Sequence, residues 1–263
     1  MKKKYMLVLF VFLFILSYFI SLGNGAAKIP IGEIVRAIFS EENNVNRQVI
    51  WNVRLPRTIL AGLVGICLSL SGAILQGVMR NPLAGPNIIG VSAGAGFAAL
   101  LLLILFPEFY FLAPGGAFAG ALLATLFIYT LAWKDGALPT RLILAGVAVS
   151  SLLNAGINAL MTFYPDRVAG VISFMVGGLS ATTWIQVKMI LPYISIGIMA
   201  VLFLPTKLNV LALGDEVATG LGLSVEKTRF LFIILSSLLA GAAVSAVGLL
   251  GFVGLMVPHI ARF

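Results

Sequence analysis

Long stretches without charge dominate this chain. No charged residue occurs from Leu142 to Pro165, and His259 is the only ionisable side chain between Phe230 and Ala261. A helix needs roughly 20 apolar residues to cross the hydrocarbon core of a bilayer, which is about 30 Å thick. Charged residues make up 10% of the chain, whereas a soluble domain carries about 25%. With a mean hydropathy of +1.10, the pattern predicts an all-α, polytopic transmembrane helical bundle.

Eight membrane spans are predicted from these stretches, and mostly short polar loops join them. The spans cover residues 6–22, 58–79, 89–106, 112–133, 142–163, 189–204, 230–247 and 249–261. No polar block is long enough for a separate soluble domain, so residues 1–263 are expected to form a single transmembrane domain. Only Gly248 separates the last two spans, which suits either a glycine hinge or a re-entrant element packed inside protein. The chain stops at Phe263 directly after them, so we expect a C-terminal truncation.

Positive charge predicts the orientation of these spans. Three lysines precede the first apolar run, from Tyr5 to Leu22, and we expect an uncleaved first span with a cytosolic N-terminus. The loops on the cytosolic side then carry Arg80, Lys134, Arg141, Lys207, Lys227, Arg229 and Arg262. The opposite side carries Lys28, Arg36, Arg47, Arg54, Arg57, Arg167 and Lys188, most of them in the long first loop.

Several functions are disfavoured by what the chain lacks. Its lone Cys67 allows no internal disulfide and no thiolate metal cluster. The net charge of +8 is scattered over loops without interleaved aromatic residues, so we expect no nucleic-acid partner. No Asp, Glu, Lys or Arg lies within a predicted span, which disfavours a proton-driven pump. His259 has no credible catalytic partner, and no lysine follows a glycine as in a phosphate-binding loop. We expect no catalytic residue, no cofactor and no metal site.

Polar residues recur within the span at 142–163. Gly146, Ser150, Asn154 and Asn158 are four residues apart and are predicted to share one helical face. An asparagine amide facing lipid would be unpaired, so this face meets either another helix or a water-filled path. A shorter stripe with Gln76 lies in the span at 58–79. Uncharged polar walls suit a path whose sites must bind weakly enough to release their cargo.

Two loops have unusual composition. Arg54-Leu-Pro-Arg57 holds two arginines around a rigid proline, which suits either recognition of carboxylates or snorkelling to lipid phosphates. In the loop from Arg80 to Gly94, Pro82 and Pro86 forbid a continuous helix. Ser92 is predicted to cap the helix that follows.

A third loop, from Leu213 to Arg229, predicts a short surface helix. Asp215 and Glu216 would lie in its first turn, where the helix dipole favours acids. Gly222 would end it, and Ser224 would cap the next helix. Val217 and Leu221 are four residues apart, and such an exposed apolar pair suits docking into a groove of a partner.

In chain order, these segments resemble FecCD-type permeases, the membrane subunits of ATP-binding cassette (ABC) importers for iron-siderophores, haem and cobalamin. The resemblance covers nearly the whole chain and implies the type II ABC importer permease fold, of which about eight of ten spans are present here. It rests on Arg54-Leu-Pro-Arg57-Thr58, Ser71-Gly72, Asn81-Pro-Leu-Ala84, Leu144-Ala-Gly146, Gly214-Asp-Glu216 to Leu221-Gly222, and Gly251-Phe-Val-Gly254 to Val257-Pro-His-Ile-Ala-Arg262.

The resemblance implies a function and a set of partners. The chain would carry an iron-siderophore-type metal chelate across the bacterial cell membrane, amid membrane lipid and with a second permease subunit. A separate ATPase would energise it, and an extracytoplasmic substrate-binding (lipo)protein would deliver the chelate. The alternative is a stand-alone secondary transporter of a small solute.

The resemblance also implies roles for particular residues. Arg54 and Arg57 would dock the binding protein, and Pro139, Thr140 and Arg141 would form a cytosolic gate. The polar stripes would line the substrate pathway through Gln76, Ser150, Asn154 and Asn158. The residues implied in ATPase coupling are Gly214, Asp215, Glu216, Ala218, Leu221 and Gly222.

Overall fold

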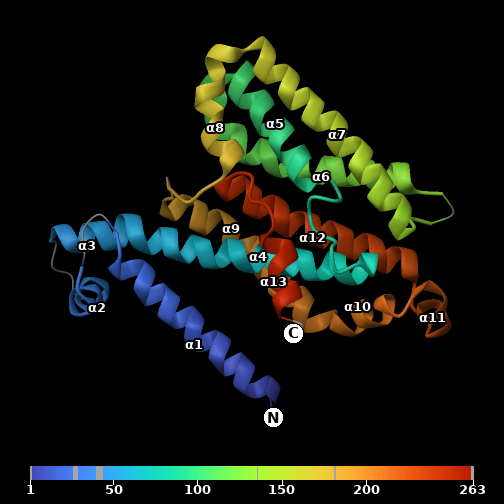
Figure 1. Ribbon diagram of the computed structural model, residues 1–263, viewed down its shortest axis with the longest axis horizontal. Coiled ribbons are helices and arrows are strands. Elements are labelled where there is room, and N and C mark those ends of the chain that lie inside the picture. Colours follow the sequence, from blue (N-terminus) through green and yellow to red (C-terminus); the bar gives the residue numbers. More distant parts are fainter. Residues whose placement is uncertain (1, 26–28, 40–43, 135, 181, 262–263) are drawn as a thin grey trace. The chain divides into compact units, whose positions relative to one another are not determined.

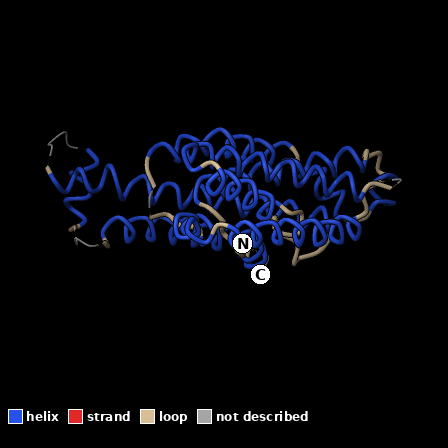
Figure 2. Tube along the Cα trace, turned by 90° about the horizontal axis from the view of Figure 1, so that it is seen from above, coloured by secondary structure: helices blue, strands red, loops and turns tan. Residues whose placement is uncertain are grey.

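The computed structural model describes residues 2–25, 29–39, 44–134, 136–180 and 182–261. Within these ranges the chain is helical with no β-strand, which confirms the predicted all-α class (Figures 1 and 2). Lys28 and Arg262, two of the charges that predict the orientation of the spans, lie outside the described residues. The α-helices are α1 (Lys2–Gly23), α2 (Ile31–Phe39), α3 (Val45–Val49), α4 (Leu55–Met79), α5 (Val91–Leu105), α6 (Ala113–Ala132), α7 (Pro139–Phe163), α8 (Val168–Val176), α9 (Trp184–Phe203), α10 (Pro205–Ala212), α11 (Asp215–Gly220), α12 (Val225–Val247) and α13 (Val253–Ile260).

The chain divides into two compact units. The first contains Met1–Gly62 and Leu179–Lys188, and the second contains Leu63–Gly178 and Met189–Phe263. Two helices, α4 and α9, run from one unit into the other. A single functional domain over residues 1–263 stays a prediction.

Five helical segments among the described residues are long and apolar enough to cross a membrane. They are Val45–Met79, Pro107–Ala132, Pro139–Phe163, Trp184–Phe203 and Val225–Val247, and each contains most of a predicted span. The shorter apolar helices Val8–Gly23 and Val91–Leu105 correspond to the predicted spans at 6–22 and 89–106. The segment Val45–Met79 is continuous because a π-helical turn, Ile50–Arg54, joins α3 to α4.

The eighth predicted span, 249–261, is wrong. Its helix α13 has eight residues over Val253–Ile260, about 12 Å of length at 1.5 Å per residue, too short to cross the core. The glycine hinge is present, since α12 ends at Val247 and Gly248 has a φ of +80°. The amide of Leu249 donates to the carbonyl of Phe174 at 3.0 Å. This hydrogen bond holds the segment between α12 and α13 against the end of α8.

Several short helices lie outside the predicted spans. The spans leave residues 23–57 as a loop, whereas α2 forms there and buries Ile34 and Ala37 against Leu22 and Ile50. The spacing of Ile31, Ile34 and Ile38 was the available signal, because apolar residues three and four apart indicate an amphipathic helix. Helices α8 and α10 have nine and eight residues, which is below the length that identifies a membrane span.

The second unit is built around α12, which is buried along most of its length. Polar contacts attach its neighbours: Ser71 of α4 lies 2.7 Å from Ser236, and Thr125 of α6 lies 2.5 Å from Ser237, oxygen to oxygen. Helices α5 and α6 approach closely at Gly94 and Gly120, where a Cβ on either residue would overlap the other's carbonyl oxygen. Small residues allow such close packing between membrane helices.

Candidate functional site

Three segments of the second unit meet at what we name the charged end. It comprises the described residues of the α6–α7 turn and the start of α7 (133, 134 and 136–141), α11 with the start of α12 (residues 214–229), and Arg80. In Figure 1 the end of α6, the start of α7 and the start of α12 lie near one another at one end of this unit. The predicted gate residues and the predicted coupling residues therefore belong to one structural neighbourhood.

The short helix α11 forms as predicted and begins after Gly214, whose φ of +114° favours glycine. Asp215 and Glu216 occupy its first turn. It ends in a Schellman motif: the amide of Gly222 donates to Thr219 at 2.9 Å and that of Leu223 to Ala218 at 2.9 Å. Gly222 has a φ of +80°, which explains why a glycine stands at this position.

The two faces of α11 differ. Val217 is 50% exposed and Leu221 is 63% exposed, whereas Ala218 is fully buried. The predicted apolar pair therefore lies on the surface, and Ala218 lies on the inner face of the same helix. Ser224 takes the predicted N-cap position of α12, but its side chain makes no capping hydrogen bond to any described residue.

The predicted gate residues lie at the start of α7. Pro139 is buried as the first residue of the helix, where a missing N–H costs nothing. Thr140 is exposed, and the guanidinium of Arg141 donates to the carbonyl of Lys134 at 2.5 Å. The amide of Ala137 donates to Glu226 Oε2 at 3.0 Å, so this turn is tied to the start of α12.

A fully buried arginine, Arg229, stands at the centre of the charged end. Its Nη2 lies 2.7 Å from Asp215 Oδ1, and its Nη1 lies 2.6 Å from Glu226 Oε1. Arg80, whose side chain is 42% exposed, lies 3.8 Å from the same oxygen of Asp215. The sequence analysis counted Arg229 only as a loop charge. The available signal was Glu226 three residues earlier, a spacing that pairs charges on a helix.

The polar stripe of α7 does not have a single environment, which corrects the prediction of one shared face. Gly146 packs against the backbone at Ile88, and the buried hydroxyl of Ser150 points toward Gly90. Asn154 and Asn158 are exposed. Steps of four residues rotate by about 40° each on an α-helix, so the stripe turns from the protein interior toward the surface.

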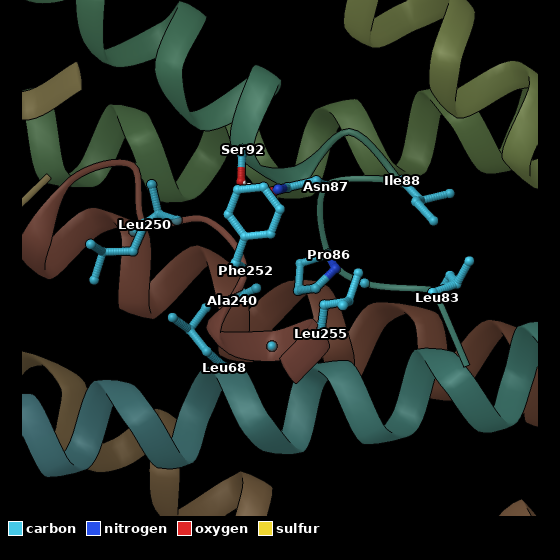
Figure 3. A pocket seen from close by; sticks show the side chains of 13 residues that line it. Leu68, Leu83, Pro86, Asn87, Ile88, Ser92, Ala240, Leu250, Phe252 and Leu255 are labelled. Atoms are coloured by element: carbon cyan, nitrogen blue, oxygen red, sulfur yellow. Dashed lines mark hydrogen bonds between the residues drawn. The ribbon is translucent and has the colours of Figure 1, made fainter. Parts of the chain in front are cut away.

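Gln76 lies elsewhere, at the contact between α4 and α13. It is buried, and its Nε2 donates to the carbonyl of Leu255 at 3.3 Å. Nearby, a cavity of about 80 Å³ is lined by α4, α12, α13 and the loop before α5. Figure 3 shows Asn87, Ser92 and Phe252 around it. Phe252 is 76% exposed and has a φ of +65°, an uncommon conformation that tends to occur at functional sites.

The loop before α5 is non-helical through Pro82 and Pro86, as predicted. The predicted capping role of Ser92 is wrong. Gly90, with a φ of +70°, takes the N-cap position of α5, which places Ser92 inside the first turn. The Ser92 hydroxyl donates to Asn87 Oδ1 at 2.5 Å instead, a contact visible in Figure 3.

The two arginines of the Arg54-Leu-Pro-Arg57 segment differ in their surroundings. Arg54 is only 9% exposed, and its guanidinium donates to the carbonyls of Leu22 at 2.7 Å and Gly23 at 3.3 Å. It therefore caps the C-terminus of α1, where the helix dipole favours a cation. Arg57 is exposed. Docking of a partner by these arginines stays a prediction, and the exposed guanidinium of Arg57 fits it better.

No group of three or more His, Cys, Asp or Glu that could hold a metal ion occurs in the described part of the chain. The long apolar helices define a multi-pass membrane protein. The chain belongs to the FecCD transport family, whose model matches residues 13–263.

Relatives of known name support this assignment. The chain is 39% identical over 257 residues to the Fe(3+)-citrate import system permease protein YfmE of Bacillus subtilis (strain 168), covering 97% of this chain and 77% of that protein. It is 39% identical over 215 residues to the cobalamin import system permease protein BtuC of Halobacterium salinarum, covering 81% and 58%. A solved structure described as a metal-chelate type ABC transporter in an inward-facing conformation matches with a TM-score of 0.80 at 29% identity, over 98% of this chain and 81% of that one. The predicted family and fold are confirmed.

Proposed function

We propose that this chain is the membrane-spanning subunit of an ABC importer that carries an iron-siderophore-type metal chelate into the cytosol. Relatives named as permeases for ferric citrate and cobalamin support the cargo class. The observation that supports coupling to an ATPase is α11, because it presents Val217 and Leu221 on the surface and is linked through Arg229 and Glu226 to the turn before the predicted gate residues. An exposed apolar pair on a short helix fits a groove of a partner protein.

The mechanism follows from separate roles for this chain and its partners. ATP is bound and hydrolysed in a partner subunit, which docks on α11 from the cytosolic side and moves it. The start of α7, at Pro139, Thr140 and Arg141, opens or closes the path in response. This assignment places the N-terminus of α1 in the cytosol and the Arg57 surface on the opposite side of the membrane.

The pathway is formed with a second permease subunit. Asn154 and Asn158 on the exposed side of α7 offer uncharged donors and acceptors to a bulky cargo. Such groups bind weakly enough to let the cargo leave, as conduction requires. Ser150, whose hydroxyl is buried, and Gln76, at the contact between α4 and α13, are proposed to line more enclosed parts of the pathway.

The cargo is tested by uptake in cells that lack this chain. Restoring the chain should restore uptake of at least one of radiolabelled ferric citrate, a ferric hydroxamate or cobalamin. A variant of the partner ATPase that binds but does not hydrolyse ATP should abolish that uptake. Uptake of none of the three chelates by a strain with an intact ATPase and binding protein would contradict the proposed cargo class.

Charge reversal at Arg57 should weaken docking of the binding protein about five- to tenfold, mainly through slower association. The remaining affinity should depend less on salt, because one screened attraction has been removed. Arg36→Glu is the matched control, since Arg36 is also an exposed arginine of the first unit. The affinity is measured by surface binding at two salt concentrations. Equal effects of R57E and R36E would refute a specific role for Arg57.

A further inference from the structure

We propose that Arg229 is a positioning residue that links the ATPase-docking helix α11 to the α6–α7 turn before Pro139, so that the two move together. We call this turn the gate turn. This inference rests on the proposed function, because it assigns the element through which docking is communicated. Arg229 touches neither the cargo nor the ATPase in this account. It holds two acids. Asp215 belongs to α11, and Glu226 is hydrogen-bonded to the gate turn.

The geometry of the guanidinium makes this link possible. An arginine side chain is a planar, rigid fork that remains charged at every relevant pH. One arm of Arg229 reaches Asp215, the first residue of α11, at 2.7 Å. The other arm reaches Glu226 in the first turn of α12 at 2.6 Å. The side chain is fully buried, whereas the two acids keep 29% and 34% of their side-chain surface exposed.

Glu226 extends the link to the gate turn. Its second carboxylate oxygen accepts a hydrogen bond from the amide of Ala137 at 3.0 Å, two residues before Pro139. Gly136 allows this close approach, because it has a φ of +117° and a Cβ there would lie 2.9 Å from Glu226 Oε1. The ring of Tyr129 packs against Phe230 at 4.9 Å between centroids, which holds the end of α6 against α12.

The burial of Arg229 makes the link stiff. A buried guanidinium that loses one of its two carboxylates keeps N–H donors without a partner, so separating α11 from α12 is costly. The hydrogen bond from Ala137 opposes movement of the turn away from Glu226, and Arg229 holds that carboxylate in place. Arg80 contributes less, because its pair with Asp215 spans 3.8 Å and is solvent-exposed. A displacement of α11 is therefore passed to the turn before Pro139 instead of being absorbed between the helices.

The test compares ATP hydrolysis with transport in the complete importer reconstituted in liposomes. In Arg229→Met the fork is replaced by an apolar side chain, and the partly exposed acids can be hydrated. In Glu226→Gln one amide cannot accept from both Arg229 and Ala137, so one connection is lost. For both variants we expect assembly with the ATPase and hydrolysis within twofold of the wild type, but at least fivefold more ATP hydrolysed per chelate transported.

Two further variants keep the test decisive. Lys227→Met removes an exposed charge from the same turn of α12 and should leave the ratio unchanged. If Arg229→Met does not assemble with the ATPase, Arg229→Lys replaces it in the test. Lysine retains the charge but not the fork, so this variant should also raise the amount of ATP hydrolysed per chelate transported. A normal ratio of ATP hydrolysed to chelate transported in R229M and E226Q would overturn this inference but not the proposed function. A parallel loss of hydrolysis and transport would do the same. A wild-type complex without ATP-dependent uptake would overturn the proposed function as well.

Discussion

Replacement of Gly72 by alanine is expected to displace α13 and to destabilise the protein by about 3 kcal/mol, near the upper end of the usual cost of overpacking. The reason is steric. A Cβ on Gly72 would overlap the backbone carbonyl oxygen of Gly254 in α13, and backbone cannot rotate aside as a side chain can. For a chain of this size the midpoint of thermal unfolding should fall by about 6–12 °C, measured on the purified protein in detergent.

Gly65→Ala is the matched control for this prediction. Gly65 lies two turns earlier on the same helix, and no atom lies within 4 Å of a Cβ added there. Alanine is the better helix former by up to about 1 kcal/mol, so this variant should be as stable as the wild type or slightly more so. Equal midpoints for the two variants would show that α13 does not pack on α4 as described.

Replacement of Gly220 by tryptophan is expected to abolish uptake, at least 100-fold, while leaving the fold intact. Gly220 is the exposed last residue of α11, and a Cβ added there meets no atom within 4 Å. Because Gly220 is exposed and has room for a Cβ, we expect the added side chain to extend into solvent, where it would block a partner seated on Val217 and Leu221. Co-purification of the ATPase and uptake of the labelled chelate measure the effect.

Two comparisons sharpen this experiment. Gly170→Trp adds the same bulk at an open position on α8 and should keep the ATPase bound. Gly222→Trp should also abolish uptake, but Gly222 has a φ of +80°, so its effect includes backbone strain and is less diagnostic. Normal uptake by a correctly folded Gly220→Trp protein would contradict ATPase docking on α11.

The elements that sequence could predict are those fixed by local chemistry. Lipid imposes long uncharged runs on spanning helices, so α4, α6, α7, α9 and α12 were predictable to within a few residues at most ends. Pro82 and Pro86 excluded a helix before α5, and the order of acids and glycines predicted α11. In each case the residues that determine the structure lie within the element itself.

The rest depends on partners that are distant in sequence. Arg54 is buried because the carbonyls of Leu22 and Gly23 accept its hydrogen bonds from 32 and 31 residues away. Arg229 is buried because Asp215 lies 14 residues earlier and is brought back by the loop after α11. The eighth span failed for a different reason, since an apolar stretch of 13 residues suits a short re-entrant helix as well as part of a span. Tertiary packing, which no local pattern records, decides such cases.

The central claim is that this chain moves its cargo only with energy from a separate ATPase. It is tested most directly by reconstituting the purified chain in liposomes with the binding protein and a labelled ferric chelate, with and without the ATPase. Accumulation against a gradient should require both the ATPase and hydrolysable ATP. Accumulation without the ATPase, driven by an ion gradient, would contradict this account and identify the chain as a stand-alone secondary transporter.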